Sequence, residues 1–488
     1  MNIDKLRVMF HNLLSGSQQP TDPQALTDLL LRVANALDRA LLKSPKNRVF
    51  VEVCAQAHKL LVTMVRRPDI RLNLERALEL WNQAYQAAPH REDFALELAE
   101  LYLWKNQCDD VLELLRNLES QDPRTRARVD LSRYTAHILM GNCEAALGAV
   151  SHWPSRPDTH YQRAMALIQS GEIESGQCEF LQSVTEEVPR FAGIPTWQGG
   201  PFSEKAALFT MYDTRGGGDE LMFATPLASL HSQFETVYIE AEPRSKKLYE
   251  ESFPGAYIFN IGDEPPWKLN PALPSPEIQS NTRTLSARLY AKPSSFPVSS
   301  GHFRCSDSDL AYWIKQTNAF AGGRLKVGLS WRSYHSVGPT ARESLTIEDL
   351  APLMMLGDQV AFFNLQYDLT AEDKQELHSK FGVEIYDPTE LNQLDDFHGV
   401  AAYASSLDVT VGNMNTNMII ACSAGVPFVE LAPDYMPVCF LVLPWYSNRH
   451  RFLRSWNEDW QAPCEAAATH LAEIIKEERL HRPISNTG

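Results

Sequence analysis

The sequence lacks the features that mark several large classes of protein. It has no run of 18 or more apolar residues, so no membrane-spanning helix is expected. Its first residues suggest an amphipathic helix and show neither the apolar core nor the cleavage site of a signal peptide. Its 8 cysteines form no CxxC pair and no zinc-like spacing with histidine. These absences predict a reduced, cytoplasmic protein without a bound metal.

Basic charge is also scarce. The chain has 45 Lys and Arg residues against 61 Asp and Glu residues, a formal net charge of −16. This balance argues against binding to nucleic acid or to an anionic membrane surface. Residues 1–190 carry 22 basic and 25 acidic side chains, so most of the acidic excess falls on the rest of the chain. The two parts therefore differ in kind.

The first part is rich in Ala, Leu, Glu, Gln and Arg and has the pattern of helical repeats. Apolar residues recur at three- and four-residue steps, which predicts helices that bury one face. Similar turns occur at Asn106, Gly141 and Gly171, at steps of 35 and 30 residues. These periods predict stacked helix–turn–helix units that resemble the tetratricopeptide repeat. Such units either form a protein-binding surface or only support the rest of the chain.

The second part alternates short apolar runs with helical segments, which predicts doubly wound parallel sheets. We expect strands at Ala206–Tyr212, Thr236–Glu240, Ala256–Asn260, Lys326–Ser330, Val360–Gln366, Val383–Tyr386, Val409–Val411 and Phe428–Leu431. We expect helices at Asp307–Phe320, Ile347–Leu356, Ala371–Phe381, Asp396–Ser406, Thr416–Ala424 and Cys464–Lys476. The proline-rich stretch 263–303 is expected to wrap a surface or line a cleft.

These patterns predict a chain of α + α/β class with four segments. A helical repeat domain covers residues 1–190, and a linker rich in Gly and Pro covers 191–205. Two Rossmann-like halves follow, over residues 206–322 and 323–488. Two such halves in tandem create a cleft where the carboxyl ends of their strands face each other.

A glycine-rich segment follows the first predicted strand. Gly216, Gly217 and Gly218 allow a backbone to approach a ligand closely, and the helix that they open favours anions at its start. Asp219 lies at that start and is our candidate general base toward an acceptor hydroxyl. The alternative is a glycine turn with an acidic helix cap. The segment is neither a GxGxxG motif nor a Walker loop.

Polar residues also end the first two predicted strands of the second half. Ser330, Trp331 and Arg332 follow the first of these, and Arg332 offers positive charge to a phosphate unless it forms a surface ion pair. Gln366 ends the next strand. It either hydrogen-bonds a base or sugar or is a buried amide satisfied by loop backbone.

A third polar group, Asn413, Asn415, Thr416 and Asn417, lies between a predicted strand and helix. A helix start beside a sheet edge suits phosphate binding through free N–H groups, and ordinary capping is the alternative.

Three acidic residues are expected to act in helix capping. Asp396 opens a predicted helix. Asp307 and Asp309 form a D-x-D sequence, a known metal-binding motif, but they directly precede a helix rather than end a strand. No other metal cluster is visible in the sequence.

Taken in order, these motifs resemble a known family of glycosyltransferases with the GT-B fold. The stretch 216–227 is similar to the opening motif of heptosyltransferases. The segments 327–332, 364–367, 394–397 and 424–427 look like bacterial proteins that join tetratricopeptide repeats to such a transferase. Bacterial flagellin glycosyltransferases and, more distantly, O-GlcNAc transferases share this plan. The resemblance covers nearly the whole chain.

The resemblance implies a metal-independent, inverting transfer of a sugar from a nucleotide-activated donor to a hydroxyl, without a cofactor. Asp219 aligns with the acidic residue proposed as base in heptosyltransferases. The second half would hold a UDP-, CMP- or ADP-type donor through Arg332, Gln366 and the 413–417 segment. We therefore expect a cytoplasmic protein O-glycosyltransferase that modifies Ser or Thr. Its helical repeats would hold the protein acceptor, with flagellin as the expected one.

Two other functions stay open. Heptosyltransferases carry an Asp-Thr…His segment where this chain has Asn415, Thr416, Asn417 and Ile419, which favours a non-catalytic scaffold or adaptor. A lipopolysaccharide-type sugar transferase is the third possibility. The acidic balance and the absence of a basic amphipathic anchor count against it.

Overall fold

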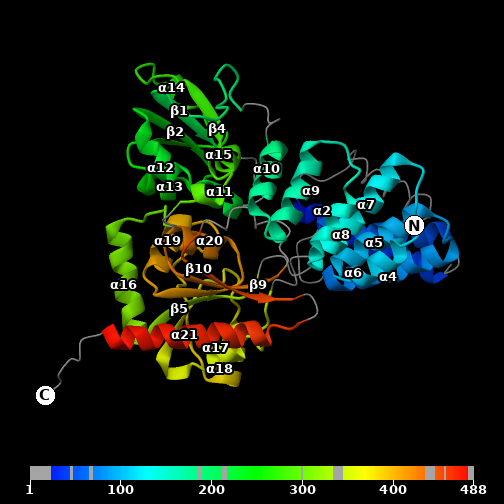
Figure 1. Ribbon diagram of the computed structural model, residues 1–488. Helices are drawn as coiled ribbons and strands as arrows, with labels where there is room; N and C mark the ends of the chain where they lie inside the picture. Colours follow the sequence, from blue (N-terminus) through cyan, green and yellow to red (C-terminus); the bar gives the residue numbers. More distant parts are fainter. Residues whose placement is uncertain are drawn as a thin grey trace. The chain divides into compact units, whose positions relative to one another are not determined.

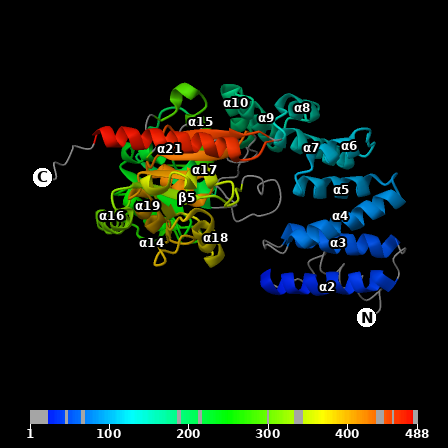
Figure 2. The ribbon, with the colours of Figure 1, turned by 90° about the horizontal axis from the view of Figure 1, so that it is seen from below.

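The computed structural model describes most of the chain in two compact units (Figures 1 and 2). The described chain divides between His152 and Trp153. The described residues are 23–43, 48–64, 70–184, 190–211, 217–297, 301–332, 344–434, 446–455 and 458–481.

The first unit is helical. Its helices are α2 (Pro23–Lys43), α3 (Arg48–Met64), α4 (Ile70–Ala87), α5 (Glu92–Trp104), α6 (Cys108–Leu115), α7 (Pro123–Leu139) and α8 (Cys143–Ala149). Each helix packs against the next along the chain, as Figure 2 shows for α2 to α5. Leu37, Cys54, Trp81 and Phe94 are buried in one core, in which the Trp81 and Phe94 rings meet edge to face. This stacking is the expected repeat architecture.

The repeat turns share one backbone conformation, in both units. Asn106, Gly141 and Gly171 all have positive φ, at 59°, 77° and 92°. In each turn the next residue donates its N–H to a carbonyl five residues earlier, at 2.8 Å, from residues 107, 142 and 172. This is the Schellman end of a helix, which requires a left-handed residue and explains the glycines.

The second unit begins with α9 (Pro157–Gln169) and α10 (Ile173–Val184), followed by a four-stranded parallel sheet. The strand order is β3-β2-β1-β4. The strands are β1 (Ala206–Thr210), β2 (Thr236–Ala241), β3 (Tyr257–Asn260) and β4 (Ile278–Asn281). Its helices are α11 (Gly217–Phe223), α12 (Leu227–Leu230), α13 (Lys246–Ser252), α14 (Pro266–Leu269) and α15 (Thr282–Leu289).

A six-stranded parallel sheet follows, in the order β10-β9-β8-β5-β6-β7. Its strands are β5 (Leu325–Ser330), β6 (Val360–Asn364), β7 (Ile385–Tyr386), β8 (Val409–Gly412), β9 (Phe428–Pro433) and β10 (Arg449–Arg454). Its helices are α16 (Asp307–Ala321), α17 (Ala351–Met354), α18 (Ala371–Phe381), α19 (Phe397–Ser405), α20 (Thr416–Ser423) and α21 (Gln461–His481).

The second sheet is the middle of three layers. Val327 and Leu329 of β5 face the core formed with α17, α18 and α21, whereas Phe363 of β6 belongs to the core that includes α19 and α20. In Figure 1 these helix groups lie on opposite sides of the sheet. The strand order is that of a doubly wound fold. The prediction of helical repeats followed by two Rossmann-like halves is therefore confirmed.

Some local predictions were wrong. The proline-rich stretch 263–303 contains β4 and α15. β4 forms a strand there because it pairs with β1. The helix expected at Ile347–Leu356 is reduced to α17, and β10 was not foreseen. Part of the segment that we expected to be a linker packs along β4, where the buried Gln279 donates to the carbonyls of Phe191 and Ile194.

Candidate functional site

The topology of the second sheet places its candidate site. The strand order changes direction between β5 and β8, and ligands of such sheets bind outside the carboxyl ends at this point. Ser330 ends β5, and Gly412 ends β8 beside it. A Cβ on Gly412 would lie 1.6 Å from the Ser330 carbonyl oxygen, so only glycine allows the two strand ends to approach this closely.

Gln366 joins the strand ends through a buried amide. Its Oε1 accepts hydrogen bonds from the Ser330 hydroxyl at 3.1 Å and from the backbone N–H groups of Trp331 and Arg332 at 3.1 and 3.0 Å. Its Nε2 donates to the Arg332 carbonyl at 3.0 Å and to Asp368 at 2.7 Å. The amide therefore holds the loop after β5, which is the structural role that we considered for it.

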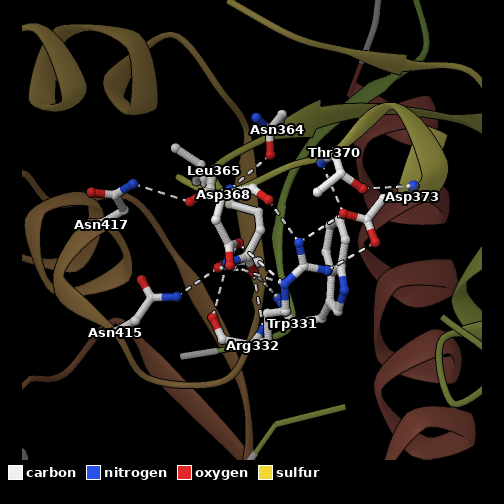
Figure 3. Close-up of polar contacts among 11 residues, drawn as sticks. Trp331, Arg332, Asn364, Leu365, Asp368, Thr370, Asp373, Asn415 and Asn417 are labelled. Carbon is white, nitrogen blue, oxygen red and sulfur yellow. Dashed lines mark hydrogen bonds and ion pairs between the residues drawn. The ribbon is translucent and has the colours of Figure 1, made fainter. Parts of the chain in front are cut away.

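Arg332 is occupied by two carboxylates. Its guanidinium donates to Asp373 at 2.7 and 2.9 Å and to Asp368 at 3.1 Å (Figure 3). Asp373 also completes the capping box of α18 with Thr370. The Trp331 side chain is buried in the core against α17 and α21. In this structure Arg332 forms ion pairs within the chain and Trp331 packs in the core, so both side chains stabilise the fold.

The start of α20 lies beside this network. Asn415 caps the helix by accepting from the Met418 N–H, and its Nδ2 donates to the Ser330 hydroxyl at 2.6 Å. Asn417 donates to the Leu365 carbonyl and to Gln393. Thr416 is half-buried. The predicted donor residues around Ser330, Gln366 and Asn415 are thus one hydrogen-bonded group.

Asn413 differs from its neighbours. Its side chain is 1% exposed, and neither its amide oxygen nor its amide nitrogen has a hydrogen-bond partner among the described residues. A buried amide without partners costs free energy, so Asn413 is a candidate to hydrogen-bond a ligand.

A polar cavity of about 230 Å³ lies where β6 and β7 end. Asn364, Gln366, Asp387, Asn392 and Gln393 supply its polar groups. Among the described lining residues, Asp387 is the only one with a carboxylate. Its Oδ2 lies 2.5 Å from the Nζ of Lys374. Sequence analysis identified Gln366 but missed Asp387, although Asp387 directly follows an expected strand. That position is the signal that could have identified it.

The glycine-rich segment lies at the contact between the two halves. Gly216 is outside the described residues. A Cβ on Gly217 would lie 2.7 Å from the Phe397 ring of α19, and one on Gly218 would lie 2.9 Å from Ile419 and 3.3 Å from Thr416 of α20. These two glycines therefore let α11 pack closely against the helices of the second half.

Asp219 follows these glycines in the first turn of α11 and is half-buried. Burial raises the pKa of its carboxyl group, and the positive charge of Arg283 partly offsets this effect. The next residue, Glu220, is buried and accepts from the Ser245 hydroxyl at 2.5 Å. The candidate base therefore directly follows a glycine that packs so close to the start of α20 that an added Cβ would lie 3.3 Å from Thr416.

Of the remaining acidic candidates, Asp396 caps a helix, as expected, whereas Asp307 and Asp309 do not. Asp396 accepts from the Gly399 N–H at 2.8 Å at the start of α19. Asp307 and Asp309 lie in the first turn of α16, where Ser306 is the cap.

A potential set of metal ligands lies elsewhere, in the first unit. Ligand atoms of Asp38, Cys54 and His58 lie within 4.8 Å of one another. Arg76 donates to Asp38 at 2.9 and 3.0 Å, and His58 contacts both Asp38 and Asn73. Burial also raises the pKa of the Cys54 thiol, which disfavours the thiolate that binds metal. Hydrogen bonds within the chain account for this cluster.

Comparisons with known proteins agree with the repeat prediction. Residues 73–132 match the tetratricopeptide repeat family. Protein FlbA of Caulobacter vibrioides is 25% identical over 382 residues, which cover 72% of this chain and 61% of FlbA. The chain thus matches about three fifths of that relative's length.

Among the described helices, none is both long and apolar enough to cross a bilayer.

Three solved structures show weak similarity to the chain. A glycosyl transferase family 9 protein from Veillonella parvula has a TM-score of 0.40 at 12% identity and covers 56% of this chain and 98% of its own. The E. coli ADP-heptose lipopolysaccharide heptosyltransferase II has a TM-score of 0.37 at 12% identity, covering 56% and 99%. An O-GlcNAc transferase mutant from Thermobaculum terrenum has a TM-score of 0.31 at 15% identity, covering 89% and 93%. The fold assignment rests on the two sheets themselves.

Proposed function

We propose that the protein is a glycosyltransferase that moves a sugar from a nucleotide-activated donor to a hydroxyl group. One observation carries the proposal. The start of α11, at Gly218, packs beside the start of α20, at Thr416. Each of these helices follows a parallel strand at which the strand order of its sheet changes direction. Asp219, the residue that follows Gly218, is the carboxylate that this half would supply to a site at the helix start of the other half.

The donor's nucleotide would occupy the second half. The cavity at the ends of β6 and β7 has amide groups and one carboxylate, and its described lining residues include neither Lys nor Arg. That lining suits a neutral, hydrogen-bonding group such as a nucleoside. The start of α20, with the unpartnered amide of Asn413 before it, suits the phosphate.

The proposed reaction is a direct displacement. The acceptor hydroxyl oxygen forms a bond to the anomeric carbon, while the bond from that carbon to the phosphate oxygen breaks. Asp219 takes the hydroxyl proton, and N–H groups at the start of α20 stabilise the departing phosphate. The transfer would invert the anomeric centre and need no metal, as the family resemblance implies. Asp307 and Asp309 are used in the first turn of a helix, which supports this reading.

The proposed acceptor is Ser or Thr of a protein held by the helical repeats, with flagellin as the expected one. The tetratricopeptide match over residues 73–132 supports a protein-binding surface. The test is mass spectrometry of flagellin from cells with and without this protein. Loss of a sugar-sized mass on Ser or Thr supports the proposal, and unchanged flagellin overturns this acceptor.

Donor binding is tested separately by calorimetry with UDP, CMP and ADP. Thr389 is exposed at the rim of the cavity, so Thr389→Trp should obstruct it and weaken binding at least tenfold. The matched control is Thr469→Trp, on the exposed side of α21. Equal binding by both variants would remove the cavity from the donor site.

The candidate base is tested with Asp219→Asn. This variant should reduce transfer by about 100-fold or more, the usual value of general base catalysis, and keep nucleotide affinity. Asp307→Asn, which changes an exposed carboxylate in α16, is the control and should keep activity. Full transfer by the Asp219 variant would exclude this residue from the mechanism.

A non-catalytic scaffold is the second candidate. The observation that favours it is the pairing of Arg332 with Asp368 and Asp373, which occupies a cation that we had assigned to the donor phosphate. A scaffold should bind none of the three nucleotides tightly. Binding of one of them in the micromolar range would exclude it.

A further inference from the structure

Arg244 connects the two halves of the α/β unit. It lies between β2 and α13, which belong to the first half. Its Nη1 donates to the carbonyl of Leu394 at 3.2 Å, and its guanidinium carbon lies 4.8 Å from the ring centre of Phe397. Leu394 and Phe397 belong to the second half, where Phe397 begins α19. The positive charge of Arg244 therefore lies where the two halves are in contact.

The guanidinium of Arg244 also lies next to parts of the proposed donor site. A Cβ on Gly217, in the glycine-rich segment, would be 3.4 Å from its Nη2. Leu394, which accepts from Arg244, lines the polar cavity. The preceding residue, Gln393, lines the same cavity and accepts from Asn417 at the start of α20, at 3.0 Å. Arg244 is therefore a cation at the edge of the cavity, one residue along the chain from the contact between the cavity and the start of α20.

Arg244 has N–H groups to spare for a ligand. A guanidinium has five N–H donors, and here Nε donates to Glu242 at 2.7 Å and Nη1 to Leu394. Nη2 donates to no acceptor among the described residues, and the side chain is 35% exposed. By contrast, all three nitrogens of Arg332 donate to carboxylates of the chain. Arg244 is thus available in a way that Arg332 is not.

We propose that Arg244 binds the phosphate of the sugar donor from the first half, while the start of α20 binds it from the second half. This inference rests on the proposed function. It identifies a counter-charge for the donor in place of Arg332, and it divides the recognition of the phosphate between the two halves. The N–H groups of a planar guanidinium match the oxygens of a phosphate, which is why arginine suits this role.

The test is calorimetry with UDP, CMP and ADP, each compared with its nucleoside, and with inorganic pyrophosphate. The wild type should bind one nucleotide more tightly than the nucleoside. Arg244→Gln should lose about tenfold to a hundredfold in affinity for that nucleotide and for pyrophosphate, as expected for a charged hydrogen bond, and should keep its affinity for the nucleoside. Arg244→Lys should retain part of the affinity, because it keeps the charge without the planar group.

Lys246→Gln is the matched control. It removes one positive charge two residues away, from a side chain that is 36% exposed, and it should bind like the wild type. An equal loss in this control would mean that the charges act by general attraction. An equal loss of nucleoside affinity in Arg244→Gln would mean that Arg244 only holds Leu394 at the cavity wall. Either result would overturn the proposal.

Labelling of the wild type with phenylglyoxal, which modifies accessible guanidinium groups, does not depend on the folding of a variant. Pyrophosphate should protect Arg244, as followed by peptide mass spectrometry. It should not change the labelling of Arg304, which is also exposed on the α/β unit. Labelling of Arg244 that is the same with and without pyrophosphate would overturn the proposal.

Two outcomes separate this inference from the proposed function. Phosphate binding that depends on Arg244, in a protein that transfers no sugar, would leave the inference standing and remove the proposed function. Sugar transfer by Arg244→Gln with an unchanged KM for the donor would keep the proposed function and overturn the inference.

Discussion

Replacing Gln366 with Leu should destabilise the α/β unit strongly, whether or not a ligand is present. Leu has a similar size and no polar atoms, so the change removes the hydrogen bonds and little volume. Gln366 is 0% exposed, and its partners are parts of the loop after β5, chiefly the N–H groups of Trp331 and Arg332. The variant leaves these groups without an acceptor.

The magnitude follows from the groups left unpaired. A buried polar group without a partner costs about 1–3 kcal/mol, and the Trp331 N–H lies in such a place. The Arg332 N–H is only partly buried, and Gln366 lines the polar cavity, so water can compensate some of its loss. The Ser330 hydroxyl keeps its bond from Asn415. We expect a total loss of about 3–5 kcal/mol of unfolding free energy.

The assay is urea unfolding followed by peptide-resolved hydrogen exchange, which separates the α/β unit from the repeat helices. Gln359→Leu makes the same change at an exposed amide in the same half and should stay within about 0.5 kcal/mol of wild type. If Gln366→Leu were as stable as this control and lost only nucleotide binding, the amide would act on the ligand. Our reasoning about the network would then be refuted.

Two further predictions concern other parts of the chain. Burial raises the pKa of Glu220 from its usual 4.5 to about 7, so its contribution to stability is complete below pH 4.5 and is lost as the pH rises through 7. The loss amounts to about 3 kcal/mol, and thermal melts of Glu220→Gln should lack it; an equally steep decline in the variant would contradict this origin. Gly141→Ala should cost about 1 kcal/mol, because Gly141 has a φ of 77° while its added Cβ meets nothing within 4 Å. Gly148→Ala, inside α8 and equally free of contacts, should instead raise the melting temperature, and equal effects of both changes would refute the assigned turn.

Local signals predicted many of the elements. The helix expected at Ala371–Phe381 has those bounds, because Thr370 and Asp373 form a capping box at its start and Gly382 takes the left-handed conformation at its end. The capping of α19 by Asp396 and the place of the D-x-D pair at the start of α16 followed from the same kind of signal. The repeat turns at Asn106, Gly141 and Gly171 likewise needed only their own few residues.

Elements that depend on distant partners were missed. β4 lies within a proline-rich stretch, and it becomes a strand by pairing with β1 about 70 residues earlier. β10 has charged residues where a buried strand usually has apolar ones. Arg449 and Arg451 fit because both pair with the buried Glu430 of β9 at 3.2 and 3.0 Å. No local sequence pattern predicts such an ion pair between two strands.

The order of helices and strands along this chain is encoded in neighbouring residues, because caps, turns and apolar periodicity act over a few positions. The same sequence named Arg332, Gln366, Gly217 and Gly218 as residues that could meet a ligand. Whether they are available depends on folding, since Asp373 reaches Arg332 from 41 positions away, and Phe397 and Ile419 fill the space beside the glycines. The hydrogen-bond partners and packing neighbours of a side chain can lie far away in the sequence and meet it only after folding. Whether a candidate residue is free to contact a ligand is therefore decided by the tertiary structure and not by the neighbouring residues.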